Sequence, residues 1–306
     1  MLVECLEKLA LERGVVIRRG IGVESVTAGA DSRGEEKESG SAAGKGKGLR
    51  VHLSDGACVP ATHVIGADGK WSKVRQSIPS FHVNHITCPS FGVHMTLETE
   101  NGWERNGTYV IRSPEEPLFY LIASPLHDAG LSITMVCKDQ ITAKYPWLEP
   151  PAEMRPEDYG RGGWKDEYSV VPAAEASGAG VTALANHLEK LFREKLPAFY
   201  AAVGKEALQN ARINRRGNWM QMTGEEITFS AENGRVALIG DAAHSMTASM
   251  GEGCNTALES AARLVDAVEN HGNSLSKAIL EYGSERPKEV QPIQEMSAER
   301  NGWKKE

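Results

Sequence analysis

Long apolar segments are missing from this sequence, and no run approaches the ~20 residues that a membrane-spanning helix needs. We therefore expect no transmembrane segment. The first residues also lack the apolar core of a signal peptide and the Arg- and Ser-rich pattern of a transit peptide. A cytoplasmic location is the default expectation, although an incomplete N-terminus would have removed any targeting segment.

Concentrated positive charge is also missing. The 34 Lys and Arg residues are interspersed among 41 Asp and Glu residues, giving a formal net charge of −7 without a basic stripe. A phosphate backbone needs such a stripe, so nucleic acid is not an expected partner. The five cysteines are odd in number and scattered, which favours free thiols in a reducing compartment over a disulfide framework.

Two short motifs lack the residues that would complete them. His82-x-x-His85-x-x-Cys88 has no further ligand pair in a zinc-site arrangement, so we expect no metal. Gly44-Lys-Gly-Lys-Gly48 lacks the Walker pattern, and it lies in a polar insertion, residues 28–48, that cannot offset its own ordering entropy.

The composition fits a globular protein of one large or two moderate domains, since 41% of the 306 residues are hydrophobic. Periodicity predicts a helix over residues 2–14, followed by strands at 15–19, 23–27 and 49–53 that form a small meander. Residues 79–209 differ in character. They contain strand-like runs at 91–97, 108–112, 119–123 and 131–137, typical of an antiparallel sheet. After a long connection at 145–180, an amphipathic helix ending near Pro197 should cover one side of that sheet.

Two strand ends have the pattern of ligand-binding sites in open α/β sheets. The first is His63-Val-Ile-Gly66-Ala-Asp68-Gly69, followed by a helix over 70–76. An ordinary turn, with Asp as a cap and Gly at positive φ, is the alternative interpretation. The second is the buried strand 235–239, which ends at Asp241 and leads through a glycine loop to a helix over 256–268. Thr256 and Glu259 are spaced as a capping box.

The second strand end suits a ligand that becomes anionic during turnover, because a helix N-terminus offers unpaired N–H groups and partial positive charge. Gly240-Asp241-Ala242-Ala243-His244 with Gly251-x-Gly253-x-Asn255 resembles the Gly-Asp motif of the FAD-dependent aromatic hydroxylases, the p-hydroxybenzoate hydroxylase-like monooxygenases. Gly66-Ala-Asp68-Gly69-x-x-Ser72-x-Val74-Arg75 resembles the Asp-Gly motif of that family. Residues 122–125 and 131–136 more weakly resemble kynurenine 3-monooxygenase-like members.

The resemblance implies an α/β fold: a partial, Rossmann-like FAD/NAD(P)-binding domain with an inserted, mainly antiparallel β-sheet substrate domain. The FAD-binding domain would comprise residues 1–78 and 210–306, without its N-terminal ADP-binding βαβ unit. The substrate domain would comprise residues 79–209.

The resemblance also implies the site. Asp241 would bind the ribityl chain of FAD, the loop from Gly251 to Asn255 would lie against the isoalloxazine, and Asp68 and Gly69 would serve FAD and the nicotinamide cofactor. The expected cofactor-binding residues are Asp68, Gly69, Arg75, Gly240, Asp241, Ala242, Gly251, Glu252, Gly253, Cys254 and Asn255. NAD(P)H would reduce the flavin, dioxygen would supply a hydroxyl group to a small aromatic substrate, and no acid–base triad is expected.

Three departures from the family pattern limit this inference. Ala248 replaces a usual proline, Ser260 replaces a common aspartate, and no Gly-x-Gly-x-x-Gly occurs anywhere. Two alternatives therefore stay open: another flavin reaction of the halogenase or polyprenyl reductase type, and a non-catalytic fragment that does not bind FAD alone. The substrate-facing candidates are His94, Tyr109, Arg112 and Tyr120, whose sheet face the sequence does not determine.

Overall fold

The computed structural model describes residues 2–28, 48–88, 90–98, 102–104, 107–126, 130–149, 179–213, 218–224 and 226–300. The chain divides into two compact units. Unit 1 comprises Met1–Asn84, Met222–Ser245 and Gly253–Gln291, and unit 2 comprises His85–Gln221, Met246–Glu252 and Pro292–Glu306. Nearly all of the predicted 28–48 insertion and most of the predicted 145–180 connection lie outside the described residues.

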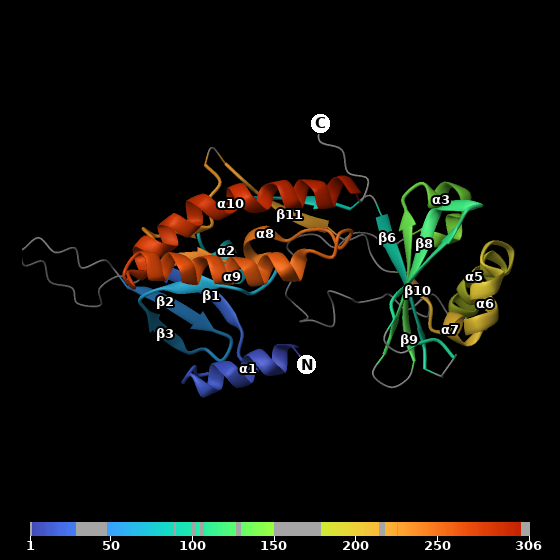
Figure 1. Cartoon of the computed structure of the whole chain (residues 1–306), viewed down its shortest axis with the longest axis horizontal. Coiled ribbons are helices and arrows are strands. Elements are labelled where there is room, and N and C mark those ends of the chain that lie inside the picture. The colour runs from blue at the N-terminus through green and yellow to red at the C-terminus, as the bar shows by residue number, and fades with distance from the viewer. Residues whose placement is uncertain are drawn as a thin grey trace, which may run out of the picture. The chain divides into compact units, whose positions relative to one another are not determined.

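Unit 1 begins with helix α1 (Leu2–Glu12) and an antiparallel meander of β1 (Val23–Ala28), β2 (Leu49–Leu53) and β3 (Cys58–Ala61) (Figure 1). The predicted strand at 15–19 is wrong, because the structure has no strand there. The third strand of the meander is instead β3, which pairs with β2 after the chain turns back at Gly56, with φ of 83°. Such a local hairpin forms with little loss of chain entropy.

A second sheet of unit 1 has the order β12 (Ser230–Ala231), β13 (Val236–Leu238), β4 (Val64–Gly66). Strands β13 and β4 are parallel, whereas β12 is antiparallel to β13. All three residues of β13 are buried, as predicted for a strand covered on both faces. The short helices α2 (Lys73–Gln76) and α8 (Asp241–His244) follow β4 and β13 along the chain.

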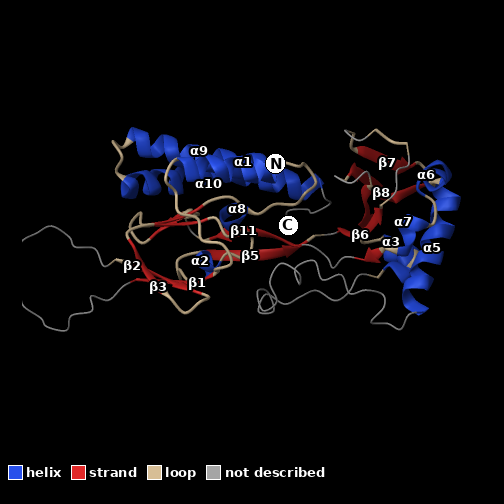
Figure 2. Ribbon diagram, turned by 90° about the horizontal axis from the view of Figure 1, so that it is seen from below, coloured by secondary structure: helices blue, strands red, loops and turns tan. Residues whose placement is uncertain are grey.

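Helices α9 (Gly253–Asn270) and α10 (Leu275–Arg300) lie side by side in both views (Figures 1 and 2). Unit 1 contains α10 as far as Gln291. Helix α9 begins three residues earlier than predicted, so the capping-box interpretation of Thr256 is wrong. Periodicity predicts an apolar face formed by Ala257, Leu258, Ala261, Leu264, Val265 and Val268. That prediction is partly wrong, because Leu258 and Val265 are 45% and 56% exposed, while the buried stripe is Thr256, Ser260, Leu264 and Ala267.

Unit 2 contains a five-stranded antiparallel sheet in the order β10, β6, β9, β8, β7. The strands are β6 (Ser90–Leu97), β7 (Tyr109–Ser113), β8 (Glu116–Pro125), β9 (Leu131–Lys138) and β10 (Arg212–Ile213). This confirms the antiparallel sheet predicted from the alternating runs. A separate pair joins β5 (His82–Thr87) to β11 (Asn218–Thr223).

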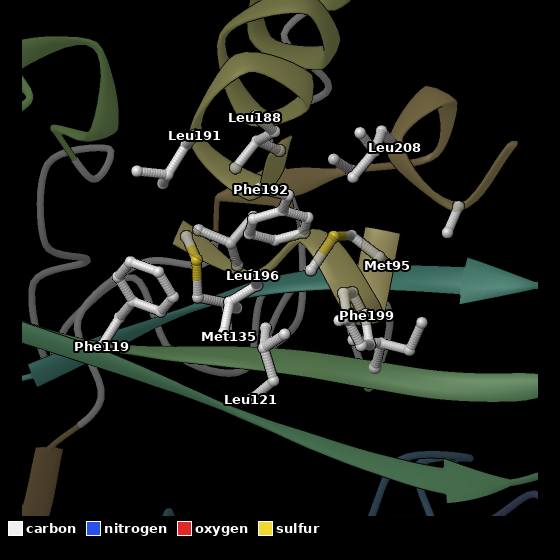
Figure 3. Packing of buried hydrophobic residues seen from close by; sticks show 14 of the residues in the cluster. Met95, Phe119, Leu121, Met135, Leu188, Leu191, Phe192, Leu196, Phe199 and Leu208 are labelled. Carbon is white, nitrogen blue, oxygen red and sulfur yellow. The ribbon is translucent and has the colours of Figure 1, made fainter. Parts of the chain in front are cut away.

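One face of the five-stranded sheet carries the core of unit 2. Helices α5 (Ala179–Lys195), α6 (Pro197–Val203) and α7 (Glu206–Gln209) cover it, and α3 (Ile141–Lys144) and a 3₁₀ turn (Pro146–Leu148) add to its edge. Figure 3 shows Phe192 and Leu188 of α5 packed toward Met95, Phe119, Leu121 and Met135 of the strands. As predicted, the helix breaks at Pro197, which begins α6.

Two sequence expectations concern the chemistry of the whole chain. All five cysteines are free. None of the helices in the described ranges combines the length and apolarity that a bilayer span requires.

Phe192→Ala tests the assignment of the core. Phe192 is fully buried against Phe119 and Phe199, with ring centroids 6.5 Å and 5.5 Å away. We expect the substitution to lower the free energy of unfolding by about 3–5 kcal/mol in urea titrations. The control is Val110→Ala, because Val110 is 56% exposed on the opposite sheet face; it should cost less than about 0.5 kcal/mol. Equal losses in both variants would contradict the assignment.

Candidate functional site

The Asp-Gly and Gly-Asp motifs follow two strands that lie next to each other. Strands β4 and β13 pair in parallel, with Gly66 opposite Leu238, and the N–H of Ile239 donates to the carbonyl of Gly66 at 2.9 Å. Because parallel strands end at the same edge of a sheet, Asp68 and Asp241 both emerge at the carboxyl edge of this pair. Segments about 170 residues apart in sequence therefore form one locus.

Two glycines allow the close packing behind this edge. A Cβ atom on Gly66 would lie 2.8 Å from Cδ2 of Leu238 and 2.9 Å from Cβ of Val74, so a larger residue would push α2 off the sheet. Gly240 has a φ of 57°, and a Cβ there would lie 3.3 Å from Cβ of Ala257 in α9. The left-handed conformation costs little for glycine, and it brings the start of α8 against the first turns of α9.

Asp68 serves as a helix cap in this structure. Its Oδ2 accepts hydrogen bonds from the N–H groups of Lys73 (2.6 Å) and Val74 (3.1 Å) at the start of α2. Gly69 has a φ of 77°, and the Oγ of Ser72 accepts from the N–H of Arg75 at 2.9 Å. These contacts are those of the capped turn that the sequence offered as an alternative. A role for Asp68 and Gly69 in cofactor binding stays a prediction.

Arg75 joins the two motifs. Its side chain is buried, with one guanidinium nitrogen donating to the carbonyl of Ala242 at 2.6 Å and the other to the carbonyl of Lys70 at 2.5 Å. Burial lowers the pKa of Arg75 to about 10, while the nearby charge of Asp68 opposes that shift. The guanidinium stays charged at neutral pH and is occupied by main-chain oxygens from both motifs.

The Gly-Asp motif presents its carboxylate on the surface. Asp241 is exposed at the first position of α8, whereas Ala242 is buried beneath it. Gly253, Cys254 and Asn255 form the first turn of α9, and Cys254 and Asn255 are exposed. These residues belong to unit 1, together with Asp68, Gly69, Arg75, Gly240, Asp241 and Ala242.

Gly251 and Glu252 belong to the segment 246–252, which precedes α9 directly and is grouped with unit 2. Gly251 has a φ of 74° in a turn closed by its N–H, which donates to the carbonyl of Ala248 at 3.2 Å. A glycine is favoured at that position by backbone geometry. Alanine at position 248, the departure from the family's proline, keeps an ordinary backbone within the same turn.

A buried polar network behind the motif was not predicted. Nε2 of His244 lies 2.8 Å from Oγ of Ser260, and Nε of Arg286 donates to the same oxygen at 3.0 Å. Arg286 is 2% exposed and forms ion pairs with Glu259 (2.8 Å) and Glu289 (2.6 Å). Ser260 thus has a structural role at the position where the family commonly has aspartate. His244 and Ser260 lie in the segment that the sequence had singled out, but no spacing pattern in the sequence pointed to Arg286.

Unit 2 contains a cavity of about 980 Å³ on the sheet face opposite the helices. Its lining includes Arg112 and Tyr120, two of the predicted substrate-facing candidates. The other two candidates lie elsewhere. Tyr109 packs on Trp103, with ring centroids 4.6 Å apart, and it adjoins the hydrophobic core. His94 is absent from the lining of this cavity, and its Nδ1 lies 3.5 Å from Oγ1 of Thr134.

Comparison with known proteins shows what parts of the chain are similar to. Residues 185–297 match the family model described as an FAD binding domain. Kynurenine 3-monooxygenase from Cryptococcus neoformans is 26% identical over 247 residues, which cover 78% of this chain and 40% of that protein. The enzyme of the same name from Candida albicans is 29% identical over 105 residues, covering 34% of this chain and 22% of that protein.

Solved structures agree in fold. HpxO of Klebsiella pneumoniae, crystallised with FAD, superposes with a TM-score of 0.59 at 17% identity, covering 97% of this chain and 63% of that chain. A 2-methyl-3-hydroxypyridine-5-carboxylic acid oxygenase superposes with a TM-score of 0.58 at 18% identity, covering 98% of this chain and 64% of that chain. The chain is therefore similar in sequence to kynurenine 3-monooxygenases and similar in fold to these two proteins. These matches agree with the predicted resemblance, and the predicted fold class is confirmed.

The matched segments span 22% to 40% of the length of the kynurenine 3-monooxygenases above, and the chain covers less than two thirds of the HpxO and oxygenase chains. The family's Gly-Asp motif lies within the matched FAD binding domain segment.

The pH dependence of stability tests the buried network of the hydroxylase-like unit 1. Burial, with a smaller contribution from the Arg286 charge, lowers the pKa of His244 from 6.5 to about 4. Between these values the unfolded chain binds more protons than the folded chain, so stability falls as the pH is lowered from 6.5 to 4. The expected loss is on the order of 3 kcal/mol.

His244→Gln should remove most of this slope in urea unfolding measured across that pH range. His82→Gln is the matched control, because His82 is exposed on β5. A slope that persists unchanged in His244→Gln would contradict the assignment.

Proposed function

We propose that this chain supplies the ribityl and isoalloxazine side of an FAD site and that, once completed, it hydroxylates a small aromatic molecule with NAD(P)H and dioxygen. The observation that carries the proposal is the exposed carboxylate of Asp241 at the carboxyl edge of the parallel β4–β13 pair, with Gly240 packed against the first turns of α9. The FAD binding domain match over the same segment supports it.

The residues present fit this part of the cofactor. A carboxylate such as Asp241 accepts hydrogen bonds from hydroxyl groups of a polyol chain. The first turn of the 18-residue helix α9 offers main-chain N–H groups and partial positive charge. An anionic reduced flavin would be stabilised there. When bound, FAD would supply the reductive activation of dioxygen, and the protein would position the substrate and exclude water.

Uncovered apolar surface in unit 1 supports the proposed division into domains. No described residue of α1 is buried, and Leu2, Leu6 and Leu9 are all more than 40% exposed. Strand β4 ends the order of its sheet, and its Ile65 is 43% exposed; Leu258 and Val265 of α9 are exposed as well. We infer that residues 1–78 and 210–306 form an FAD-binding domain that an ADP-binding βαβ section would cover, with residues 79–209 as the substrate domain.

The uncovered apolar surface of unit 1 also favours a second proposal, which concerns the chain expressed by itself. Without the Gly-x-Gly-x-x-Gly turn, the 306 residues lack the usual holder of the ADP half of FAD. We therefore propose that the isolated chain binds flavin weakly and that fusion to a Gly-x-Gly-x-x-Gly βαβ section makes it able to retain FAD. A halogenase-type or polyprenyl reductase-type reaction remains an alternative chemistry on this scaffold.

A chimera tests the proposal. The chain is fused behind a Gly-x-Gly-x-x-Gly βαβ section of the dinucleotide-binding type, and FAD retention is measured by absorbance after gel filtration. We expect the chimera to retain FAD, and Asp241→Ala to weaken FAD binding by about tenfold or more, because a charge-assisted hydrogen bond is lost. Asp266→Ala is the control, since Asp266 is exposed farther along α9.

Unchanged FAD binding in Asp241→Ala would remove Asp241 from the site. Stoichiometric flavin on the unextended chain would contradict the proposed need for a completing section. The reaction itself is tested with labelled dioxygen and a panel of aromatic compounds: incorporation of one labelled oxygen atom into a product supports hydroxylation, and flavin reduction without incorporation supports the alternative chemistries.

A further inference from the structure

Three hydroxyl groups of unit 2 join the loop 246–252 to the end of helix α10. Oγ1 of Thr247 donates to the carbonyl of Ser297 at 2.8 Å, and the hydroxyl of Ser249 donates to the same carbonyl. In return, Oγ of Ser297 donates to the carbonyl of Thr247 at 2.8 Å. We call Thr247, Ser249 and Ser297 the hydroxyl clamp. It binds the loop to α10 on both sides of Ala248.

The carbonyl that accepts these bonds lies at a helix end. Helix α10 ends at Arg300, so the carbonyl of Ser297 is among its last four. Such carbonyls have no donor within their own helix and are satisfied by side chains, water or a following turn. The clamp is also shielded from water, because Ser297 is 0% exposed and Thr247 is 7% exposed. Removing one partner of a buried hydrogen bond leaves the other unsatisfied, so each hydroxyl of the clamp matters to the loop.

The end of α10 is itself fixed within unit 2. Nε2 of Gln294 donates to the carbonyl of Met220 in β11 at 3.0 Å. Ala298 is buried in a cluster with Trp219 of the same strand. Ser297 lies between Gln294 and Ala298 along the helix, so it is a firm point of attachment. The helix therefore restrains the loop through the clamp.

The turn that follows Thr247 gains from such a restraint. The N–H of Gly251 donates to the carbonyl of Ala248 at 3.2 Å, and Gly251 has a φ of 74°. Glycine loses more conformational entropy on ordering than any other residue. Alanine at position 248 leaves φ free to vary, whereas proline would fix it. Restraint at the start of the loop reduces the number of conformations that this turn can adopt.

We propose that Ser297 is a positioning residue for the flavin, because through Thr247 and Ser249 it holds the loop that leads into the first turn of α9. This inference deepens the proposed function and rests on it for the identification of the ligand beside the loop as the isoalloxazine. Ser297 is buried and acts through the loop. The clamp keeps the entry to α9 in one conformation, so that the partial positive charge of the helix N-terminus stabilises the anionic reduced flavin.

The first measurement uses the 306-residue chain without FAD and records NMR order parameters of the Ser249 and Gly251 backbone amides. We expect values of about 0.85 in the unsubstituted chain, typical of a rigid backbone, and below about 0.6 in Ser297→Ala. Thr247→Val keeps the shape of the side chain but lacks the hydroxyl, so it should loosen the loop equally. Thr247→Ser keeps the hydroxyl and should leave the loop rigid.

Ser284→Ala is the matched control. Ser284 is exposed on the same helix, and its hydroxyl donates to the carbonyl of Glu281 at 3.0 Å. The substitution removes a helix hydroxyl that makes no contact with the loop, so both order parameters should stay unchanged. Ser249→Ala removes the second donor and tests the clamp from the loop side, independently of Ser297. Circular dichroism and the urea midpoint of each variant establish that it is folded.

The second measurement is the midpoint potential of FAD bound to the chimera. We expect Ser297→Ala to weaken binding of reduced flavin about tenfold relative to oxidised flavin, which lowers the potential of this two-electron couple by about 30 mV. Ser284→Ala should leave the potential unchanged. A purely structural role for Ser297 would lower the urea midpoint without changing the potential.

Unchanged order parameters in both Ser297→Ala and Thr247→Val would overturn the proposal, because other contacts would then hold the loop. A loosened loop with an unchanged flavin potential would also overturn it, since Ser297 would then hold the loop without positioning the flavin. If the unsubstituted chimera retains no FAD, the proposed function fails and the flavin-positioning role fails with it. The order parameters of the chain alone would still decide whether the clamp holds the loop.

Discussion

The parallel pairing of β4 with β13 is the constraint on which unit 1 depends. The pairing places two sequence motifs at one sheet edge, and Arg75 then bonds to main-chain oxygens of both. A charge held in a buried position is stable when its hydrogen bonds are made, and its removal leaves those oxygens without a partner. The Asp-Gly motif therefore acts as a support for the Gly-Asp motif.

This arrangement separates residues whose side chains are engaged within the protein from residues that are exposed at the same sheet edge. Asp68, Ser72 and Arg75 are occupied by the chain itself, and Arg286 supports the first turns of α9 from behind through Ser260 and the carbonyl of Thr256. Asp241, Cys254 and Asn255 are exposed in front of that framework.

Much of the fold could be predicted from periodicity and motif spacing, because the order of apolar and polar residues follows burial. Apolar residues alternate in 91–97 and 131–137, where alternate side chains are buried, and they form a continuous run in 235–239, where β13 is buried on both faces. The predicted strand at 15–19 was wrong because β propensity alone does not supply a pairing partner, and the third strand of the meander is β3, paired with β2. The buried face of α9 was mispredicted because Leu258 and Val265 are apolar but exposed. The network around Arg286 depends on packing between two helices, which no local pattern in the sequence encodes.

Native-state hydrogen exchange of Arg75→Met tests most directly whether one interaction holds both motifs. The amides to follow are those of Ile239, which bonds to Gly66 across the strand pair, and of Val74, which bonds to Asp68. If Arg75 joins the motifs, both amides lose protection together in Arg75→Met, while the Met135 amide in the β-sheet of unit 2 keeps its protection. If Val74 alone loses protection and Ile239 exchanges as in the unmodified chain, the two motifs are held independently and the account is contradicted.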